Sequence, residues 1–177
     1  MTKYIITGAI AILGLFLLSC GDIRTTTITL TYTVDEISST NNIVHMRTID
    51  LTEEEDYVDH RDDIESVDQI SVVAWIYNDG TDTVSASLYA DTIDTYTTED
   101  EVTTNSHIVF NPIVHIAGAD STLINWSDGF VYMMNTDYLD DLIMNHGSIT
   151  VYLIGEGDPP YDVRINAEIV ITLTVKI

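Results

Sequence analysis

Two groups of aspartates in this chain have the side-chain chemistry to bind a calcium ion. Ca²⁺ is bound by several carboxylate and carbonyl oxygens that converge from loops. The candidate ligands are Asp56, Asp59, Asp62 and Asp63 in the first group, and Asp79 and Asp82 in the second. Neither group has the spacing of an EF-hand loop, so a calcium site would be assembled from separate loops. The alternative interpretations are a solvated helix face for the first group and an ordinary hairpin turn for the second.

Trp126 and Asp128 have a second kind of binding chemistry. They lie in the polar segment 125–129, where a large apolar ring has few neighbours to pack against. Sugars stack their apolar C–H faces on such rings, and their hydroxyl groups bind nearby Asp and Asn side chains. Trp126 and Asp128 are therefore candidates for a carbohydrate site, with Trp126 closing one end of the fold as the alternative. By contrast, Trp75 lies in a strongly apolar segment, and we expect it in the core.

The sequence shows no arrangement that is typical of a catalytic site. It contains no Gly-x-Ser-x-Gly nucleophile motif, and its five histidines have no His-Glu-x-x-His spacing. With 29 acidic residues, two carboxylates near each other are expected by chance, so a carboxylate pair does not indicate a glycosidase. We expect a non-catalytic protein without a cofactor other than calcium. A hydrolase is the less favoured alternative.

Cys20 is the single cysteine of the chain, and it follows an apolar run from Ile5 to Leu18. The run is preceded by Lys3 and followed by the small residue Ser19, which is the pattern of an export signal. The run is shorter than the roughly 20 apolar residues that span a bilayer. With one cysteine, the chain cannot form an internal disulfide, and its stability must come from its core.

The four residues Leu17-Leu18-Ser19-Cys20 resemble the lipobox of bacterial lipoproteins. The resemblance implies that residues 1–19 are a cleaved signal peptide and that the thiol of Cys20 carries a lipid anchor built from fatty acids such as palmitate. Residues 20–25 would then be a short tether and residues 26–177 a single domain. The implied location is the bacterial cell envelope, and Gly21 after the cysteine implies the outer membrane if the cell is Gram-negative.

The net charge of −23 restricts the partners of the chain, which has 29 acidic and 6 basic side chains. The loss of Lys3 with the signal peptide takes the net charge to −24, because Lys3 is the only charged side chain in residues 1–19. Nucleic acid is excluded as a partner, since it requires clustered Lys and Arg. The acidic surface favours cations, basic partners or a saline medium. We expect the membrane, through the lipid, and an envelope protein or a glycan as partners.

Hydrophobic residues alternate with polar ones along most of the chain after Cys20, which is typical of antiparallel strands. The expected strands are 25–34, 43–49, 70–77, 84–90, 92–97, 107–110, 114–116, 130–133, 148–154, 163–166 and 169–177, with 70–77 as a central strand and 92–97 at an edge, followed by an exposed loop. This spacing predicts an all-β, antiparallel two-sheet β-sandwich. An immunoglobulin-like Greek key is the favoured topology, and a jelly roll is the alternative.

Two short helices interrupt this pattern. Thr52 and Glu55 have the spacing of a capping box, which predicts a helix that runs to about His60. A second helix is expected from about residue 136, with an apolar stripe that includes Leu139 and Leu142 and a stop at Gly147. We expect this stripe to cover an open end of the sandwich. The function predicted from the whole sequence is a membrane-anchored, non-catalytic structural or protein-interaction module, with a calcium- or carbohydrate-binding module as the alternative.

Overall fold

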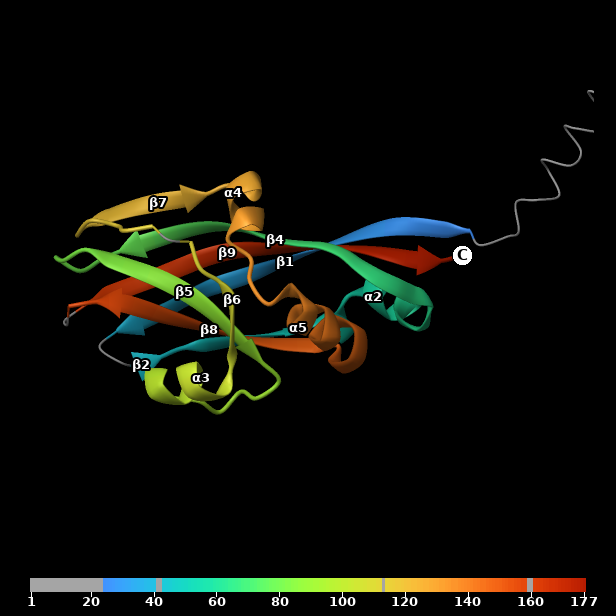
Figure 1. Ribbon diagram of the computed structural model, residues 1–177, viewed down its shortest axis with the longest axis horizontal. Helices are drawn as coiled ribbons and strands as arrows, with labels where there is room; N and C mark the ends of the chain where they lie inside the picture. Colours follow the sequence, from blue (N-terminus) through green and yellow to red (C-terminus); the bar gives the residue numbers. More distant parts are fainter. Residues whose placement is uncertain (1–23, 41–42, 113, 159–160) are drawn as a thin grey trace, which may run out of the picture.

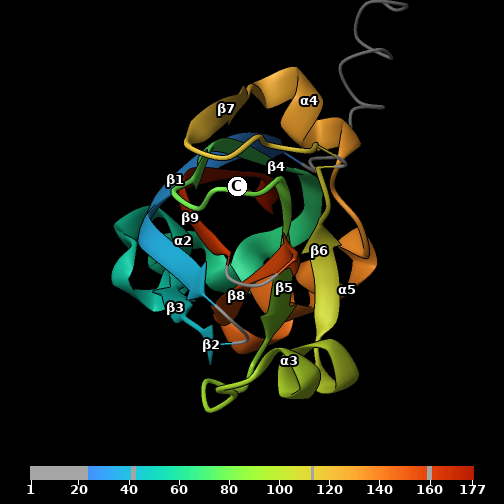
Figure 2. The ribbon, with the colours of Figure 1, turned by 90° about the vertical axis from the view of Figure 1, so that its left-hand side faces the viewer.

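The two sheets of the predicted sandwich are present in the computed structural model, which describes residues 24–40, 43–112, 114–158 and 161–177. The strands are β1 (Thr25–Thr40), β2 (Ile43–Val44), β3 (Met46–Asp50), β4 (Ile64–Asn78), β5 (Val84–Asp91), β6 (His107–Phe110), β7 (Asp120–Ile124), β8 (Ser148–Gly157) and β9 (Asp162–Lys176). One sheet has the order β2-β1-β9-β4-β7, and the other has the order β3-β8-β5-β6. The sheets face each other in Figures 1 and 2, which confirms the all-β sandwich.

The strand pairing is that of a jelly roll. Strand β1 pairs with β9, β3 with β8, β4 with β7 and β5 with β6, all antiparallel. Such nested pairs arise when one long antiparallel ribbon folds over itself, and the pairings of β4 with β9 and of β5 with β8 join the ribbon into two sheets. In an immunoglobulin sandwich the first two strands share a sheet, whereas here β1 and β3, the first two strands apart from the two-residue β2, lie in different sheets. Of the two predicted topologies, the structure has the jelly roll.

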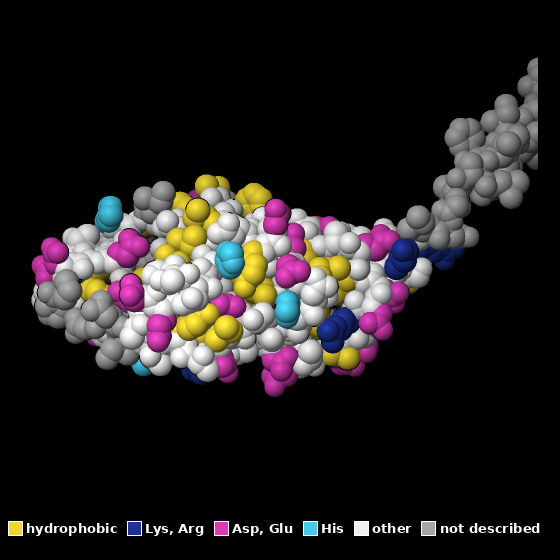
Figure 3. All heavy atoms as spheres, turned by 60° about the horizontal axis from the view of Figure 1, so that its bottom comes forward, with side chains coloured by type: hydrophobic (Ala, Val, Ile, Leu, Met, Phe, Trp, Pro, Cys, Tyr) yellow, Lys and Arg dark blue, Asp and Glu magenta, His cyan; other side chains and the backbone are white. Residues whose placement is uncertain are grey.

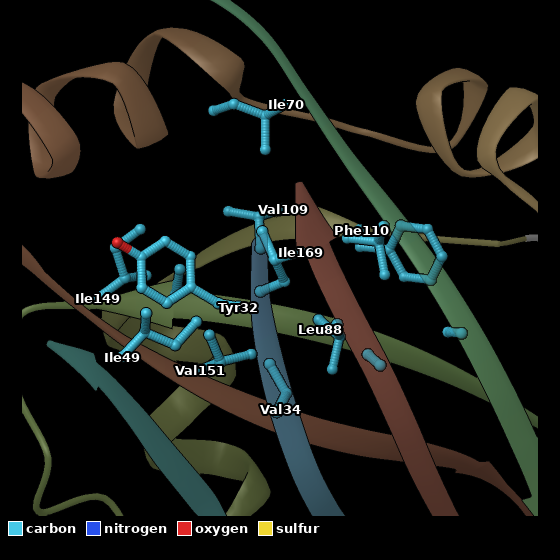
Figure 4. Packing of buried hydrophobic residues seen from close by; sticks show 14 of the residues in the cluster. Tyr32, Val34, Ile49, Ile70, Leu88, Val109, Phe110, Ile149, Val151 and Ile169 are labelled. Carbon is cyan, nitrogen blue, oxygen red and sulfur yellow. The ribbon is translucent and has the colours of Figure 1, made fainter. Parts of the chain in front are cut away.

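The core lies between the sheets and is built by alternating residues of each strand. In β9 the inward residues 163, 165, 167, 169, 171, 173 and 175 are all buried. Figure 4 shows Ile169 of this strand close to core residues from other strands, among them Tyr32 of β1 and Val151 of β8. The predicted alternation in β1 is also confirmed, because Leu30, Tyr32 and Val34 are buried.

The second helical segment covers the opening between the sheets. Helix α5 (Thr136–Asp141) continues as one π-helical turn, η3 (Leu142–His146), and the chain leaves it at Gly147 with a φ of +69°. The predicted apolar stripe is confirmed, since Leu139, Leu142 and Ile143 join the main core. This segment contacts β4 and η3 also contacts β8, so it touches both sheets (Figure 1).

The first helical segment starts differently from the prediction. A 3-10 turn, η1 (Leu51–Glu53), precedes helix α2 (Glu55–His60), and a second 3-10 turn, η2 (Arg61–Asp63), follows it. The Thr52 side chain does not cap α2. Instead, the Asp50 carboxylate accepts hydrogen bonds from the Thr52 backbone N–H, at 2.9 Å, and from its hydroxyl, at 2.6 Å, and thereby caps η1.

Three predicted strands and one predicted loop are wrong. Residues 92–97 form no strand, because side chains hold them: the hydroxyl of Tyr152 donates to the carbonyl of Ile93 at 2.7 Å. The expected loop after them contains helix α3 (Glu99–Asn105), which a capping box of Thr98 and Glu101 begins. The segment 130–133 includes the end of helix α4 (Trp126–Val131). Segment 114–116 forms no strand, and its residue Ile116 makes an isolated bridge with Val84. The two expected strands 163–166 and 169–177 are parts of one strand, β9.

Candidate functional site

The outer face of the five-stranded sheet exposes aromatic side chains of β4. Along this strand Val72 and Ala74 point into the core, so their neighbour Trp75 points outward. The prediction that Trp75 belongs to the core is wrong, because 45% of its surface is exposed. Among the described elements, α4 covers this face of β4 at Ser71, which is fully buried, and leaves the face at Trp75 open. Figures 1 and 2 show α4 at the end of the edge strand β7, next to β4.

Trp75, Tyr77 and Leu123 form what we call the aromatic platform. Trp75 and Tyr77 are two residues apart on β4 and therefore share a face, with ring centroids 6.2 Å apart and an interplanar angle of 25°. Leu123 of β7 is the register partner of Trp75 and is also 45% exposed. The platform thus places a stacked aromatic pair and an aliphatic side chain on a rigid sheet in contact with solvent.

An arginine covers the Tyr77 end of the platform. Arg164 of β9 is the register partner of Tyr77, and its guanidinium carbon lies 4.3 Å from the centroid of that ring. Its Nη1 donates to Oε2 of Glu36 at 2.6 Å, and its Nε and Nη2 donate to the carboxylate of Asp79. The hydrogen bond to Asp79, followed by the one to Glu36, raises the pKa of the Arg164 guanidinium above its ordinary value. A cation is therefore held against an aromatic ring between two carboxylates.

A groove of about 450 Å³ lies at the other end of the platform, over Trp75. Its lining comes from β1, β9, β4 and β7, and consists of Thr33, Val34, Glu36, Val73, Trp75, Leu123, Asn166, Ala167 and Glu168. The carboxylates of Glu36 and Glu168 give this groove a negative rim. A second hollow of about 300 Å³ lies beside Tyr77 and is lined in part by Asp79 and Asp120. The platform is thus flanked by two acidic hollows.

Helix α4 packs on the same outer face next to the buried Ser71. The Ser71 hydroxyl donates to the carbonyl oxygen of Trp126 at 3.1 Å. Asn125 begins the helix, because its Oδ1 accepts from the backbone N–H groups of residues 127 and 128. Gly129 is needed at the contact with β4, since a Cβ there would lie 1.8 Å from the carbonyl oxygen of Val72. These contacts fix α4 over β4 and position the first residue of the helix, Trp126.

The predicted carbohydrate residues Trp126 and Asp128 both lie on α4, and neither lines the groove over Trp75. Trp126 is 37% exposed. The carboxylate of Asp128 accepts from the Asn125 side-chain amide at 2.8 Å and so takes part in the start of the helix. The tryptophan that lines this groove is Trp75, which sequence reasoning assigned to the core.

The predicted calcium ligands fall at opposite ends of β4. The first group, Asp56, Asp59, Asp62 and Asp63, lies on α2 and η2 before the strand, and the second, Asp79 and Asp82, follows it. The 15 residues of β4 separate the two groups by roughly 50 Å, at about 3.3 Å per residue. Asp79 is also paired with Arg164. Among the described residues, no group of three or more His, Cys, Asp or Glu side chains is arranged to hold a metal ion.

A buried carboxylate away from the platform has a structural role. Asp91, at the end of β5, accepts from the hydroxyl of Tyr96 at 2.9 Å, from the backbone N–H of Thr92 at 2.6 Å and from the hydroxyl of Tyr138 at 3.4 Å. Burial, with a smaller contribution from Asp91, raises the pKa of Tyr138 to about 12. These donors satisfy the carboxylate, so it ties the segment after β5 to α5.

Acidic side chains are spread over the molecule rather than gathered in one place. Figure 3 shows Asp and Glu across a whole face, with few Lys and Arg side chains among them. Cys20, the predicted lipidation site, lies outside the described residues. In the part of the chain that the structure describes, none of the helices has the length and apolar character that crossing a membrane requires.

Comparison with known proteins assigns the chain to no family. No family model matches it, and no curated protein matches its sequence. Among solved structures, it is similar to a protein of Desmodium yellow mottle tymovirus (9% identity, TM-score 0.30, covering 88% of this chain and 91% of that one). It is also similar to Mud crab tombus-like virus (10%, TM-score 0.39, 88% and 82%) and to latent PorU from Porphyromonas gingivalis (10%, TM-score 0.35, 87% and 13%). These TM-scores are too low to carry an argument about function.

Proposed function

We propose that the protein is a lipid-anchored, non-catalytic interaction module of the bacterial cell envelope, and that it binds a protein partner on the aromatic platform. The observation that carries this proposal is the exposure of Trp75 on a rigid sheet, beside Leu123 and the stacked Tyr77. Trp, Tyr and Arg are the residue types that dominate binding energy at protein interfaces, and Trp75, Tyr77 and Arg164 lie together here. The platform's position on strands favours binding, because its side chains are held in place before a partner arrives.

The anchor would hold the domain by one end. The domain begins at β1, and the backbone N–H of Ile177 donates to the carbonyl of Arg24 at 2.8 Å, so both ends of the described chain lie together (Figure 1). A lipid on Cys20 would be attached a few residues before this point. The turn after β4, which contains Asp79, lies at the opposite end of the strand, so the Tyr77 end of the platform would face away from the membrane.

The lipid anchor is tested with the full chain and its Cys20→Ser variant, expressed in a bacterial envelope. We expect the wild-type chain to enter the detergent phase of a phase-separating detergent and its first mature peptide to carry the mass of a diacylglycerol. The Cys20→Ser variant should stay in the aqueous phase. Equal partition of the two chains would contradict the anchor.

The interaction surface is tested by photo-crosslinking in the same cells. A photoreactive residue in place of Leu123 should give a discrete protein adduct that is lost when Trp75→Ala is added. The matched control is the same residue in place of Val58 on α2, which is 52% exposed and lies outside the platform. An adduct that persists in Trp75→Ala, or that also forms from position 58, would contradict a binding site on the platform.

A carbohydrate is the second candidate for the same face. The specific observation that favours it is the open ring of Trp75 in a groove that also contains Asn166 and Glu168, since sugars stack on such rings and bind such side chains. Retention on gels of neutral polysaccharides, compared between wild type and Trp75→Ala, tests this candidate. Retardation of the wild type alone would support a glycan ligand.

A further inference from the structure

We propose that Trp75 receives an arginine or lysine side chain from a basic segment of the protein partner, so that the platform recognises positive charge through a cation–π contact and flanking carboxylates. This inference rests on the proposed function and specifies the chemistry of its partner. It rests on three observations: an internal example of the same contact on the platform, the groove over Trp75, and the charge of the chain.

The internal example is the contact of Arg164 with Tyr77. There a guanidinium lies 4.3 Å from the ring centroid and is bound by the carboxylates of Asp79 and Glu36. The sheet thus supplies both an aromatic face and acids at the correct positions around it. Such an arrangement holds a cation in one geometry, because the carboxylates fix its donors while the ring fixes its plane.

The adjacent Trp75 also lies near carboxylates, one of which, Glu36, is shared with Arg164, and it lines an open groove. Two carboxylates, those of Glu168 and Glu36, line this groove, together with the side chain of Asn166. Glu168 is the register partner of Val73, which is two residues before Trp75 on the same face of β4. Tryptophan is also the strongest cation–π partner among the aromatic side chains. A volume of about 450 Å³ accommodates an arginine or lysine side chain together with part of its backbone.

The negative charge of the chain favours a positively charged partner. With 29 acidic and 6 basic side chains, the protein attracts cations and repels anions at long range. The platform is acidic as well, since the residues that line its two hollows include Glu36, Asp79, Asp120 and Glu168. The basic side chain beside them, Arg164, is already paired with Glu36 and Asp79. The second hollow, at the Tyr77 end, gives a further acidic position for a neighbouring basic residue of the same segment.

The test uses residues 21–177, which include every described strand and helix, and two defined probes: a hexa-arginine peptide and a neutral oligosaccharide such as cellohexaose. Affinity is measured by calorimetry at low and at physiological salt. We expect the peptide to bind, Trp75→Leu to weaken it by about tenfold, and Trp75→Phe, which keeps a ring, to weaken it less. Glu168→Gln should weaken it by a few-fold.

The matched control is Trp126→Leu, which removes an equally large and similarly exposed ring from α4 and should leave the affinity within twofold. In a Trp126→Phe background Trp75 is the remaining tryptophan, so its fluorescence should be quenched by the peptide. Thermal unfolding of each variant verifies that it is folded. Trp75 is nearly half exposed, so we expect its replacement to leave the fold intact.

Equal weakening by Trp75→Leu and Trp126→Leu, or by neither, would overturn the inference, because binding would then follow overall charge alone. Binding of cellohexaose that depends on Trp75 and not on salt, without Trp75-dependent binding of the peptide, would also overturn it in favour of a glycan. The crosslinking experiment distinguishes this outcome from a failure of the proposed function. If the platform binds a protein that is not basic, the Trp75-dependent crosslink from position 123 would still form. If the platform binds no protein, that crosslink would be absent.

Discussion

Gly129 is the residue through which helix α4 touches β4, so Gly129→Ala tests how α4 is fixed to the sheet. A Cβ at this position would lie 1.8 Å from the carbonyl oxygen of Val72. A carbon and a carbonyl oxygen normally approach to about 3.3 Å, so the helix must move away from the strand by roughly 1.5 Å. The carbonyl of Trp126, on the same helix, would move with it and lose its 3.1 Å hydrogen bond from Ser71.

The expected loss of stability is the sum of three effects. Overpacking at a close contact costs about 1–3 kcal/mol. The lost hydrogen bond of the buried Ser71 costs about 1 kcal/mol more. Alanine is favoured over glycine within a helix by about 0.8–1.0 kcal/mol, which offsets part of this. We therefore expect Gly129→Ala to lower the free energy of unfolding by about 2 kcal/mol, and Tm by about 4–8 °C for a domain of this size.

Urea unfolding of residues 21–177, followed by circular dichroism, measures this change. Two controls separate its causes. Val131→Ala alters the same helix at a position that is 74% exposed and should change the free energy of unfolding by less than about 0.5 kcal/mol. Ser71→Ala removes the hydrogen bond without the clash and should cost about 1 kcal/mol. If Gly129→Ala unfolds at the same urea concentration as Val131→Ala, the close packing of α4 on β4 is refuted.

Four further expectations concern pH, the core, a helix cap and calcium. Because the pKa of Tyr138 is raised to about 12 from 10.0, the folded protein keeps a proton that the unfolded chain releases between these pH values, and stability should fall as pH rises through this window. Urea unfolding should show a shallower fall in Tyr138→Phe, and an unchanged slope would contradict the role of this hydroxyl. Leu153→Ala, at a fully buried site, should lower the free energy of unfolding by about 2–5 kcal/mol, and a loss below 1 kcal/mol would show that β8 is less buried than described. Thr98→Ala removes the N-cap of α3 and should lower the free energy of unfolding by about 1 kcal/mol in the same assay. An unchanged free energy of unfolding would contradict this cap. Calcium should raise Tm no more than sodium chloride of matched ionic strength, whereas a calcium-specific rise that Asp56→Asn or Asp79→Asn removes would support one of the predicted metal sites.

The sequence predicts those features of the fold that depend on local periodicity. Alternation identifies β1 and β9, and the apolar stripe of Leu139 and Leu142 identifies the segment that covers the opening between the sheets. Segment 92–97 has the composition of a strand, but the Tyr152 hydroxyl and the burial of Asp91 hold it in another conformation. Tyr152 lies on β8, far from this segment along the chain, so no local pattern reveals its contact. The choice between the two sandwich topologies likewise depends on which distant strands pair.

The exposure of Trp75 follows from strand pairing rather than from the composition of β4. Considered alone, segment 70–77 is apolar on both faces, and such a segment is normally buried on both. The strand register places polar side chains beside this segment. The outward residues of β4 are paired with Glu168, Asn166 and Arg164 of β9. A second layer of protein over this face would have to bury those polar groups, at a cost of several kcal/mol unless each found a partner. The face at Trp75 therefore stays open, and an aromatic ring left on an open, acidic sheet is available to a positively charged ligand.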